Sequence, residues 1–262
     1  MAEFSGTEAQ QRLQARVHEK MDWIRSTPGA CNTGRMLGTD DPGQLGLDTI
    51  SSILEQDGFC GFRMIPATQW EALNSAMLQL GYRMDLWNVF SATREEVLSA
   101  ASSDEDHGLP AGYDFRTLEK NAAPDEVAGY QALMQRAGIV PFSGEMLRGA
   151  VGPAATVGIV HIDDGLVACA HTYFSHNVTS PFHRWAWGGL VAVDERHRGR
   201  KLGVLINRFM VAKALDLGAE AIYEIVGATN TVSRKMVEAS GLSLNDGYLC
   251  GVATRSEERF TR

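Results

Sequence analysis

Apolar residues recur at helical spacing near the start of the chain. Leu13, Val17, Met21 and Ile24 fall on one face, so the pattern predicts an amphipathic helix over residues 12–24. Further along, alternating apolar residues and two capping boxes of the form Thr-x-x-Glu predict two strand–helix pairs. The strands are expected at 59–65 and 85–90, and the helices after Thr68 and Thr93.

Two stretches show no apolar period. Residues 29–48 are rich in Gly, Asp and Thr, which predicts a loop with short elements. Residues 99–112 are rich in Ser, Asp, Gly and Pro, a composition typical of an exposed linker. We therefore expect two parts, an N-terminal α/β region at residues 1–110 and a second domain at residues 113–262.

The pattern is sharper in the second part. The long helix at 200–217 is expected to bury Leu202, Ile206 and Leu217 and to expose Asn207. The order of elements predicts an α/β fold with a mixed, mostly antiparallel sheet and helices on both faces. The expected strands are 113–118, 155–162, 166–176, 184–193, 219–226 and 248–254, and the expected helices are 124–137, 200–217 and 231–240.

The composition is that of an ordinary folded protein, with 262 residues, 44% apolar and 21% charged. The net charge of −8 argues against a broad nucleic-acid surface, because phosphate neutralisation needs clustered positive charge. No apolar run approaches the ~20 residues of a spanning helix, and the charged N-terminus argues against a signal peptide. We expect a cytoplasmic protein without a membrane partner. The four cysteines lack metal-ligand spacing, so we expect reduced, mostly buried thiols and no metal.

One dense basic run, residues 196–201, stands between a strand that ends at Val193 and the start of a helix. A helix N-terminus offers unpaired backbone N–H groups and the positive end of its dipole. Gly199 permits a close approach of the backbone, and the arginines add charge. This combination predicts a cradle for an anion such as a pyrophosphate. The alternative is a solvated basic helix start that binds no ligand.

The residues around this loop resemble the signature of the GCN5-related N-acetyltransferase family, Gln/Arg-x-x-Gly-x-Gly/Ala after a strand that ends in Val. Val193, Arg196 and Gly199 match, Lys201 stands where the family usually has Gly or Ala, and Gly203 follows two residues later. A second family segment, Asn-x-x-Ala-(x)7-Gly-Phe, is similar to residues further downstream. These residues are Asn230, Ser233, Gly241 and Leu242.

The resemblance covers residues 113–262, and one interpretation of residues 1–110 is a degenerate copy of the same fold. The family resemblance implies that acetyl-CoA binds with its pantetheine arm paired to the strand before the loop. Its pyrophosphate would then bind to the backbone N–H groups of the loop. Asn230 would contact the pantetheine, with a helix N-cap as its alternative role. The implied cofactor-binding residues are Val191, Val193, Arg196, Arg198, Gly199, Arg200, Lys201, Gly203, Asn230 and Ser233.

Both proton carriers that are usual in the family are missing. The family's Tyr acid is replaced by Val237, and the strand at 185–190 has no carboxylate to serve as the family's base. The candidate catalytic residues are therefore His171, Glu224 and Tyr248. His171 is the first choice of base, because an imidazole titrates near neutral pH. An ordinary structural role is the alternative for each of the three.

Aromatic residues gather on the strands before the loop. Tyr173, Trp185 and Trp187 are the candidate substrate-binding residues, with core packing as their alternative role. An aromatic wall would favour an apolar or cationic amine as the acyl acceptor. The acidic body of the protein also favours a cationic acceptor.

These observations combine into one functional interpretation. The chain is expected to be an acyl-CoA-dependent N-acyltransferase that moves acetyl from acetyl-CoA to a primary amine of a small molecule. The loss of both proton carriers favours an alternative, a non-catalytic acyl-CoA-binding regulatory module. A protein N-acetyltransferase is a further alternative, and a homodimer is one possible assembly.

Overall fold

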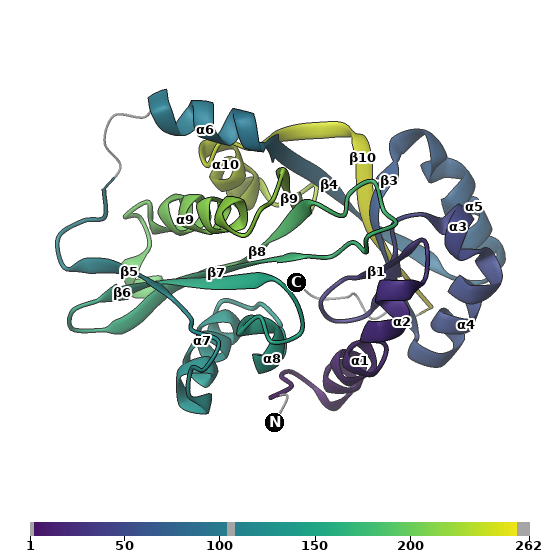
Figure 1. Ribbon diagram of the computed structural model, residues 1–262, viewed down its shortest axis with the longest axis horizontal. Helices are drawn as coiled ribbons and strands as arrows, with labels where there is room; N and C mark the ends of the chain where they lie inside the picture. The colour runs from purple at the N-terminus through teal and green to yellow at the C-terminus, as the bar shows by residue number, and fades with distance from the viewer. Residues whose placement is uncertain (1–2, 104–107, 256–262) are drawn as a thin grey trace.

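The computed structural model describes residues 3–103 and 108–255 of the chain (Figure 1). The helices are α1 (Glu8–Glu19), α2 (Met21–Ser26), α3 (Pro42–Leu45), α4 (Leu47–Asp57), α5 (Trp70–Gln79), α6 (Arg94–Ser103), α7 (Pro124–Arg136), α8 (Gly144–Leu147), α9 (Leu202–Asp216) and α10 (Thr231–Ala239). The strands are β1 (Ala30–Asn32), β2 (Leu37–Thr39), β3 (Phe59–Pro66), β4 (Arg83–Thr93), β5 (Tyr113–Thr117), β6 (Ala154–His161), β7 (Gly165–Phe174), β8 (Trp185–Val193), β9 (Ala221–Val226) and β10 (Ser243–Thr254).

The expected α/β fold with a mixed sheet is confirmed. The described strands form one ten-stranded sheet in the order β1-β2-β3-β10-β4-β9-β8-β7-β6-β5. The pairs β2·β3 and β8·β9 are parallel, and the other neighbouring strands are antiparallel. Figure 1 shows α9 and α10 on one face of the sheet and α7 and α8 on the other.

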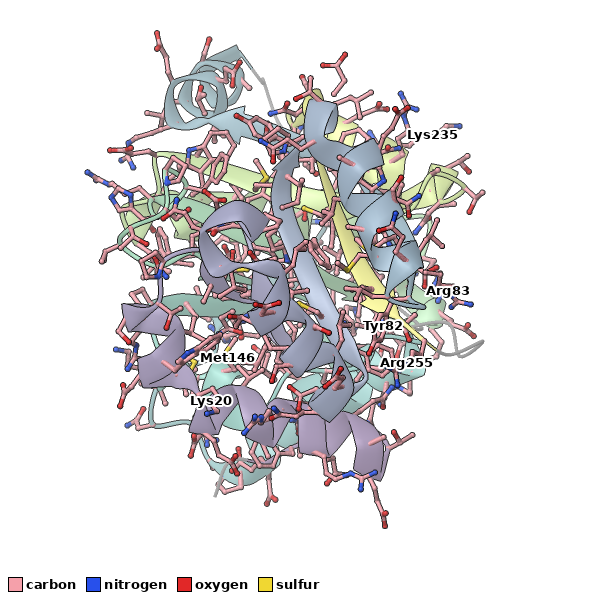
Figure 2. All side chains as sticks on the ribbon, turned by 90° about the vertical axis from the view of Figure 1, so that its right-hand side faces the viewer. Lys20, Tyr82, Arg83, Met146, Lys235 and Arg255 are labelled. Atoms are coloured by element: carbon pink, nitrogen blue, oxygen red, sulfur yellow. The ribbon has the colours of Figure 1, made fainter. Side chains whose placement is uncertain are left out.

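The strand β10 joins the two parts of the chain. It lies between β3 and β4 of the N-terminal region and is antiparallel to both. Just past its end, the guanidinium of Arg255 lies 4.8 Å from the ring centroid of Tyr82, and Figure 2 shows both residues on the same side of the molecule. Residues 1–110 and 113–262 therefore contribute strands to one shared sheet, and their division into two folding units stays a prediction.

The helix α6 begins as expected and ends later than expected. The capping box at Thr93 forms, because the Thr93 N–H donates to Glu96 Oε2 at 2.7 Å and the Glu96 N–H donates to Thr93 Oγ1 at 3.3 Å. The helix continues to Ser103 and so includes the first residues of the linker expected at 99–112. Residues 104–107 of that linker lie outside the described residues.

Other elements of the N-terminal region differ from the prediction. The helix expected at 12–24 is two helices, α1 and α2, which divide at Lys20. The stretch 29–48 holds only the short elements β1, β2 and α3 before its last residues, as expected, but α4, which begins at its end, was not predicted. The capping box at Thr68 does not form, because a 3-10 turn precedes α5 and its N-cap residue, Gln69, makes no side-chain hydrogen bond.

The helix α9 packs on one face of the sheet. Leu202 is buried as expected. The expectation that Asn207 is exposed is wrong, since this residue is fully buried and its side-chain amide donates a hydrogen bond to Glu224. The expectation that Leu217 is buried is also wrong: the residue is 40% exposed, because the helix ends at Asp216.

The helix α7 covers the opposite face. Val127, Tyr130, Leu133 and Met134 are buried, as their helical spacing predicts, and they share one hydrophobic core with Trp187. A separate core holds the N-terminal helices against β3. The sheet is therefore covered on both faces around the strands that carry the predicted site.

The four cysteines are buried and free, as expected. Burial raises the pKa of Cys60 and of Cys169 to about 12, so both thiols are neutral at ordinary pH. Within residues 3–103 and 108–255, no group of three or more His, Cys, Asp and Glu side chains is arranged to hold a metal ion. No helix in the same ranges is long and apolar enough to cross a membrane.

Candidate functional site

The strands β8 and β9 begin as parallel neighbours and then separate. Their pairing ends at Gly188 and Glu224. A bulge in β8 lies at this point, where Leu190 has a left-handed φ of 54° and the register with β7 shifts. Residues 189–193 of β8 thus pair with β7 on one edge, and no described strand pairs with their other edge.

A cavity of about 390 Å³ occupies this gap. Residues 187–191 of β8, residues 224–226 of β9 and the start of α10 line one side of it. The N-terminal region supplies most of the opposite wall, together with Ile139 and Val252 of the second part, so both parts of the chain build the site. The residues from the N-terminal region are Thr33, Arg35, Met36, Gly61, Arg63 and Trp87.

The predicted anion cradle follows β8. Gly199 and Lys201 both have left-handed backbones, with φ of 78° and 61°. In the described structure, no acceptor is found for the backbone N–H groups of residues 199–203. A run of unpartnered N–H groups at the N-terminus of a long helix is suited to bind an anion. The Arg198 side chain is paired with Glu195 at 3.4 Å.

Two side chains of the basic run hold the loop in place. The His197 ring is buried, with Nδ1 at 2.8 Å from the hydroxyl of Tyr113 and Nε2 at 3.3 Å from Asp164. Arg196 is exposed and donates to Asp164 at 3.0 Å and to Asp194 at 3.2 Å. Arg196 is therefore engaged with carboxylates of its own chain. The anchoring role of His197 was not predicted, since its partners are distant in the sequence.

Glu224 lies at the apex of the gap and lines the cavity. It is 3% exposed, and burial raises its pKa to about 7 although a hydrogen bond from Asn207 opposes the shift. The Asn207 Nδ2 donates to Glu224 Oε1 at 2.7 Å. A buried carboxyl group that titrates near neutral pH at a cavity wall has the properties of a general base.

The other two catalytic candidates lie elsewhere. His171 is fully buried, its Nδ1 is 2.8 Å from the Thr156 hydroxyl, and burial lowers its pKa to about 3. Tyr248 is half-buried and packs edge-on against Phe182, with 5.3 Å between ring centroids. Neither residue lines the cavity. The structure therefore brings only Glu224 of the three candidates to the gap.

The aromatic candidates are also separated. Trp187 lines the cavity. Tyr173 packs behind it, with 5.4 Å between ring centroids, and its hydroxyl donates to the carbonyl of Asn32 at 3.0 Å. Trp185 packs against Phe182 and does not line the cavity. One residue of the predicted aromatic wall thus faces the site directly.

Asn230 and Ser233 both line the cavity from the start of α10. The Asn230 side-chain oxygen accepts a hydrogen bond from the Ser233 N–H at 3.1 Å. The N-cap role of Asn230 is therefore confirmed. Its contact with a bound ligand stays a prediction.

A buried polar chain lies beside the cavity and was missed in the sequence. His176 Nδ1 is 2.6 Å from Asp40 Oδ2, and His176 Nε2 is 3.1 Å from the hydroxyl of Tyr223. That hydroxyl is also 2.7 Å from Ser175 Oγ. These partners come from distant segments, so no local motif marks them. The chain of bonds ties the β1–β2 segment to the central strands and so fixes the N-terminal wall of the cavity.

Comparison with known proteins agrees with this geometry. Residues 117–242 match the model of the Acetyltransferase (GNAT) family. Residues 117–242 are therefore similar to the GNAT acetyltransferase domain, and members of that family use acetyl-CoA as co-substrate. Comparison with curated protein sequences gives no match.

Solved structures share the fold over nearly the whole chain. A GCN5-related N-acetyltransferase from Kribbella flavida has a TM-score of 0.61 at 13% identity, over 98% of this chain and 99% of that one. A tandem GNAT protein from the clavulanic acid biosynthesis pathway has a TM-score of 0.53 at 16% identity, over 85% and 76%. A GCN5-related N-acetyltransferase-like protein from Streptococcus suis 89/1591 has a TM-score of 0.51 at 14% identity, over 93% and 99%.

Proposed function

We propose that this chain transfers acetyl from acetyl-CoA to a primary amine of a small molecule. The observation that carries the proposal is the open gap between β8 and β9 with the unpartnered N–H groups of residues 199–203 at its end. The free edge of β8 can pair with an extended arm that contains amides, as a further strand would. The loop can bind a pyrophosphate. Acetyl-CoA carries these two groups in the same order.

The residues present fit such a molecule. Val191 lies on the free edge of β8 and lines the cavity. Asn230 and Ser233 line the cavity from the opposite side of the gap. Lys201 departs from the family signature but keeps its backbone N–H, so the substitution removes no donor. The thioester of acetyl-CoA supplies an activated acyl carbon for attack by an amine.

Glu224 is the base that we propose. A general base works best when its pKa lies near the operating pH, and the pKa of Glu224 is about 7. Its ionised form can accept a proton from the attacking ammonium group, while Asn207 fixes its orientation. This choice replaces His171, which lies outside the cavity. Val237 lines the cavity with an apolar side chain and offers no proton for the departing thiolate.

The shape of the site supports a small acceptor over a protein chain. The N-terminal region lines the cavity with residues such as Met36 and Trp87 and so narrows the space available to an acceptor. A volume of about 390 Å³ falls in the range of small-molecule sites. A protein acceptor would need an open groove to admit its backbone on both sides of the modified residue.

The binding proposal is tested by placing a carboxylate in the loop. Gly199→Asp should abolish the rise in melting temperature that acetyl-CoA produces in the wild type, because the side chain brings a negative charge to the pyrophosphate position. Gly218→Asp is a matched control: both glycines have a positive φ and open space around them, but Gly218 lies at the far end of α9. The control should lose stability to a similar degree and keep the acetyl-CoA shift.

Two results would count against the proposal. If millimolar acetyl-CoA fails to raise the melting temperature of the wild type, the chain is not an acyl-CoA-binding protein. If acetyl-CoA binds but no free thiol is released with any amine, amino acid or aminoglycoside, the non-catalytic module is the better interpretation.

A further inference from the structure

Arg63 is a buried cation without a counter-charge. It lines the cavity from β3 and is 7% exposed. Its Nη2 donates to the carbonyl of Thr33 at 3.4 Å, its guanidinium carbon is 5.8 Å from the ring centroid of Trp187, and its Nε has no hydrogen-bond partner. Among the residues that the structure describes, no carboxylate lies within ion-pair distance of it. Burial of an unpaired charge is strongly unfavourable, so the site is incomplete by itself.

The groups around Arg63 do not supply the missing charge. Tyr173, Tyr223, Cys31 and Cys250 are its electrostatic neighbours. Burial raises the pKa of each of them, so all four are neutral near pH 7. A guanidinium stays protonated in proteins, so Arg63 keeps its full positive charge.

A second cation lines the same cavity. Arg35 is half-buried, its Nε donates to the Val140 carbonyl at 2.9 Å, and its guanidinium carbon lies 5.2 Å from the ring centroid of Phe142. Burial lowers the pKa of Arg35 to about 10, and the nearby charge of Arg63 acts in the same direction. Arg35 is therefore still a cation at neutral pH. The two arginines place like charges close together in one cavity.

Glu224 does not neutralise these arginines. Its pKa is set by burial and by Asn207, with no contribution from either arginine. Because Trp187 pairs with Tyr223 in the sheet, the side chain of Glu224 points to the opposite face from that of Trp187. Arg63 packs over Trp187, so it lies with Trp187 on the other face of the sheet from Glu224, and all three residues line the same cavity.

We infer that the acyl acceptor carries a carboxylate in addition to its amine, as in an amino acid, and that Arg63 and Arg35 bind this carboxylate while the amine faces Glu224. The inference rests on the proposed function and names its substrate class. A guanidinium matches a carboxylate through two parallel N–H donors, which makes arginine the suitable residue for this recognition. The purely apolar or cationic acceptor expected from the aromatic wall and the acidic body is replaced by one that also bears an anionic group.

The inference is tested with matched pairs of acceptors. Each amino acid of a panel is compared with its own carboxamide in a free-thiol assay with acetyl-CoA, so that only the carboxylate differs within a pair. The carboxamide of an accepted amino acid should have a kcat/KM lower by about tenfold or more, because it leaves the buried charge of Arg63 without a counter-charge. Arg63→Gln should raise the KM of that amino acid about tenfold or more and remove most of the discrimination within the pair.

Further variants separate recognition from general damage. Arg63→Lys keeps the charge and should restore part of the discrimination. Arg12→Gln, on the exposed side of α1, should behave as the wild type. The acetyl-CoA shift in melting temperature should be unchanged in all three variants, since none of these residues lies in the loop. If Arg63→Gln fails to fold, the wild-type comparison and Arg35→Gln decide the question.

Several outcomes would overturn the inference. Carboxamides that react as well as their amino acids would overturn it. An Arg63→Gln variant that raises the KM of acetyl-CoA, and not the KM of the acceptor, would also overturn it. If acetyl-CoA stabilises the protein but no amino acid is acetylated or raises the melting temperature of the CoA complex, the inference fails and acyl-CoA binding stands. Absence of any acetyl-CoA shift would instead reject the proposed function.

Discussion

The two strand–helix–strand units β3–α5–β4 and β8–α9–β9 are built alike but differ in what lies between their strands. The first strand of each unit contains a bulge with a left-handed residue, Met64 at a φ of 53° and Leu190 at a φ of 54°. Between β3 and β4 runs β10, which pairs with both strands. Between the ends of β8 and β9 there is a cavity. The protein thus fills one gap with its own chain and leaves the other open.

The connections after the two bulged strands differ in the same way. A 3-10 turn follows both strands. The strand β3 ends at Pro66, which has no N–H to offer, and α5 begins directly after the turn. After β8 the turn leads into a loop whose N–H groups at residues 199–203 have no partner within the described part of the chain. The shared plan supports the interpretation that the N-terminal region is a degenerate copy of the GNAT fold. In place of a ligand site, its bulge positions Arg63 on the wall of the other unit's cavity.

The largest effect should come from removing the strand that fills the closed gap. A chain that ends at Gly241 lacks β10, so β3 and β4 each lose a hydrogen-bonded neighbour and the buried Cys250 and Ala253 are lost from the core. We expect this variant to lose cooperative unfolding in a urea titration followed by circular dichroism.

The matched control is a single cut that removes no strand. Limited proteolysis is predicted to cut first within residues 99–112, and the two pieces should then elute together in size-exclusion chromatography because β10 joins them. A fragment of residues 1–110 that unfolds cooperatively by itself would show that the N-terminal region does not depend on β10.

The accuracy of the sequence-based predictions follows the range of the interactions involved. The long elements of the second part were predicted closely, because burial imposes a clear period on helices such as α7 and α9. The loop at 199–203 was located because its signal is local. Asn207 was predicted on the exposed face of α9, although it is buried. A polar residue on a helix is predicted to face solvent unless its buried partner is known, and here that partner is Glu224. Arg63 has no local motif at all, and only the fold brings it to the cavity.

The next largest effect is expected at the apex of the open gap. There β9 carries Glu224, whose register partner on β4 is the apolar and buried Phe90. Glu224→Gln should lower kcat by about 10²-fold or more, because the base is lost while the amide can keep the hydrogen bond from Asn207. The limb of the pH–rate profile near pH 7 should disappear with it. The control is Glu220→Gln, at an exposed residue just before β9. It should leave kcat and the pH–rate profile unchanged.

The same variant should change how stability depends on pH. The pKa of Glu224 in the folded protein, about 7, lies above its usual value of 4.5, so its contribution to stability is present below about pH 4.5 and is lost as the pH rises through 7. At about 1.4 kcal/mol per pKa unit, the loss is on the order of 3 kcal/mol, and Glu224→Gln should not show it. Urea titrations of both proteins at pH 5 and pH 8 measure the difference. If the free energy of unfolding changes equally with pH in the wild type and in Glu224→Gln, the pKa of Glu224 is not raised in the folded protein.

The smallest effect is expected in the loop at residues 199–203, which follows β8 and has no counterpart after β3. Lys201 holds a left-handed backbone, with φ of 61°, at a position where glycine carries no steric penalty, and its side chain is exposed. Lys201→Gly should therefore raise the free energy of unfolding by about 1 kcal/mol, reduced in part by the greater backbone entropy of glycine in the unfolded chain. Because the N–H is retained, acetyl-CoA should bind with little change in affinity. A large loss of affinity would show that the Lys201 ammonium group, rather than the backbone of the loop, holds the pyrophosphate.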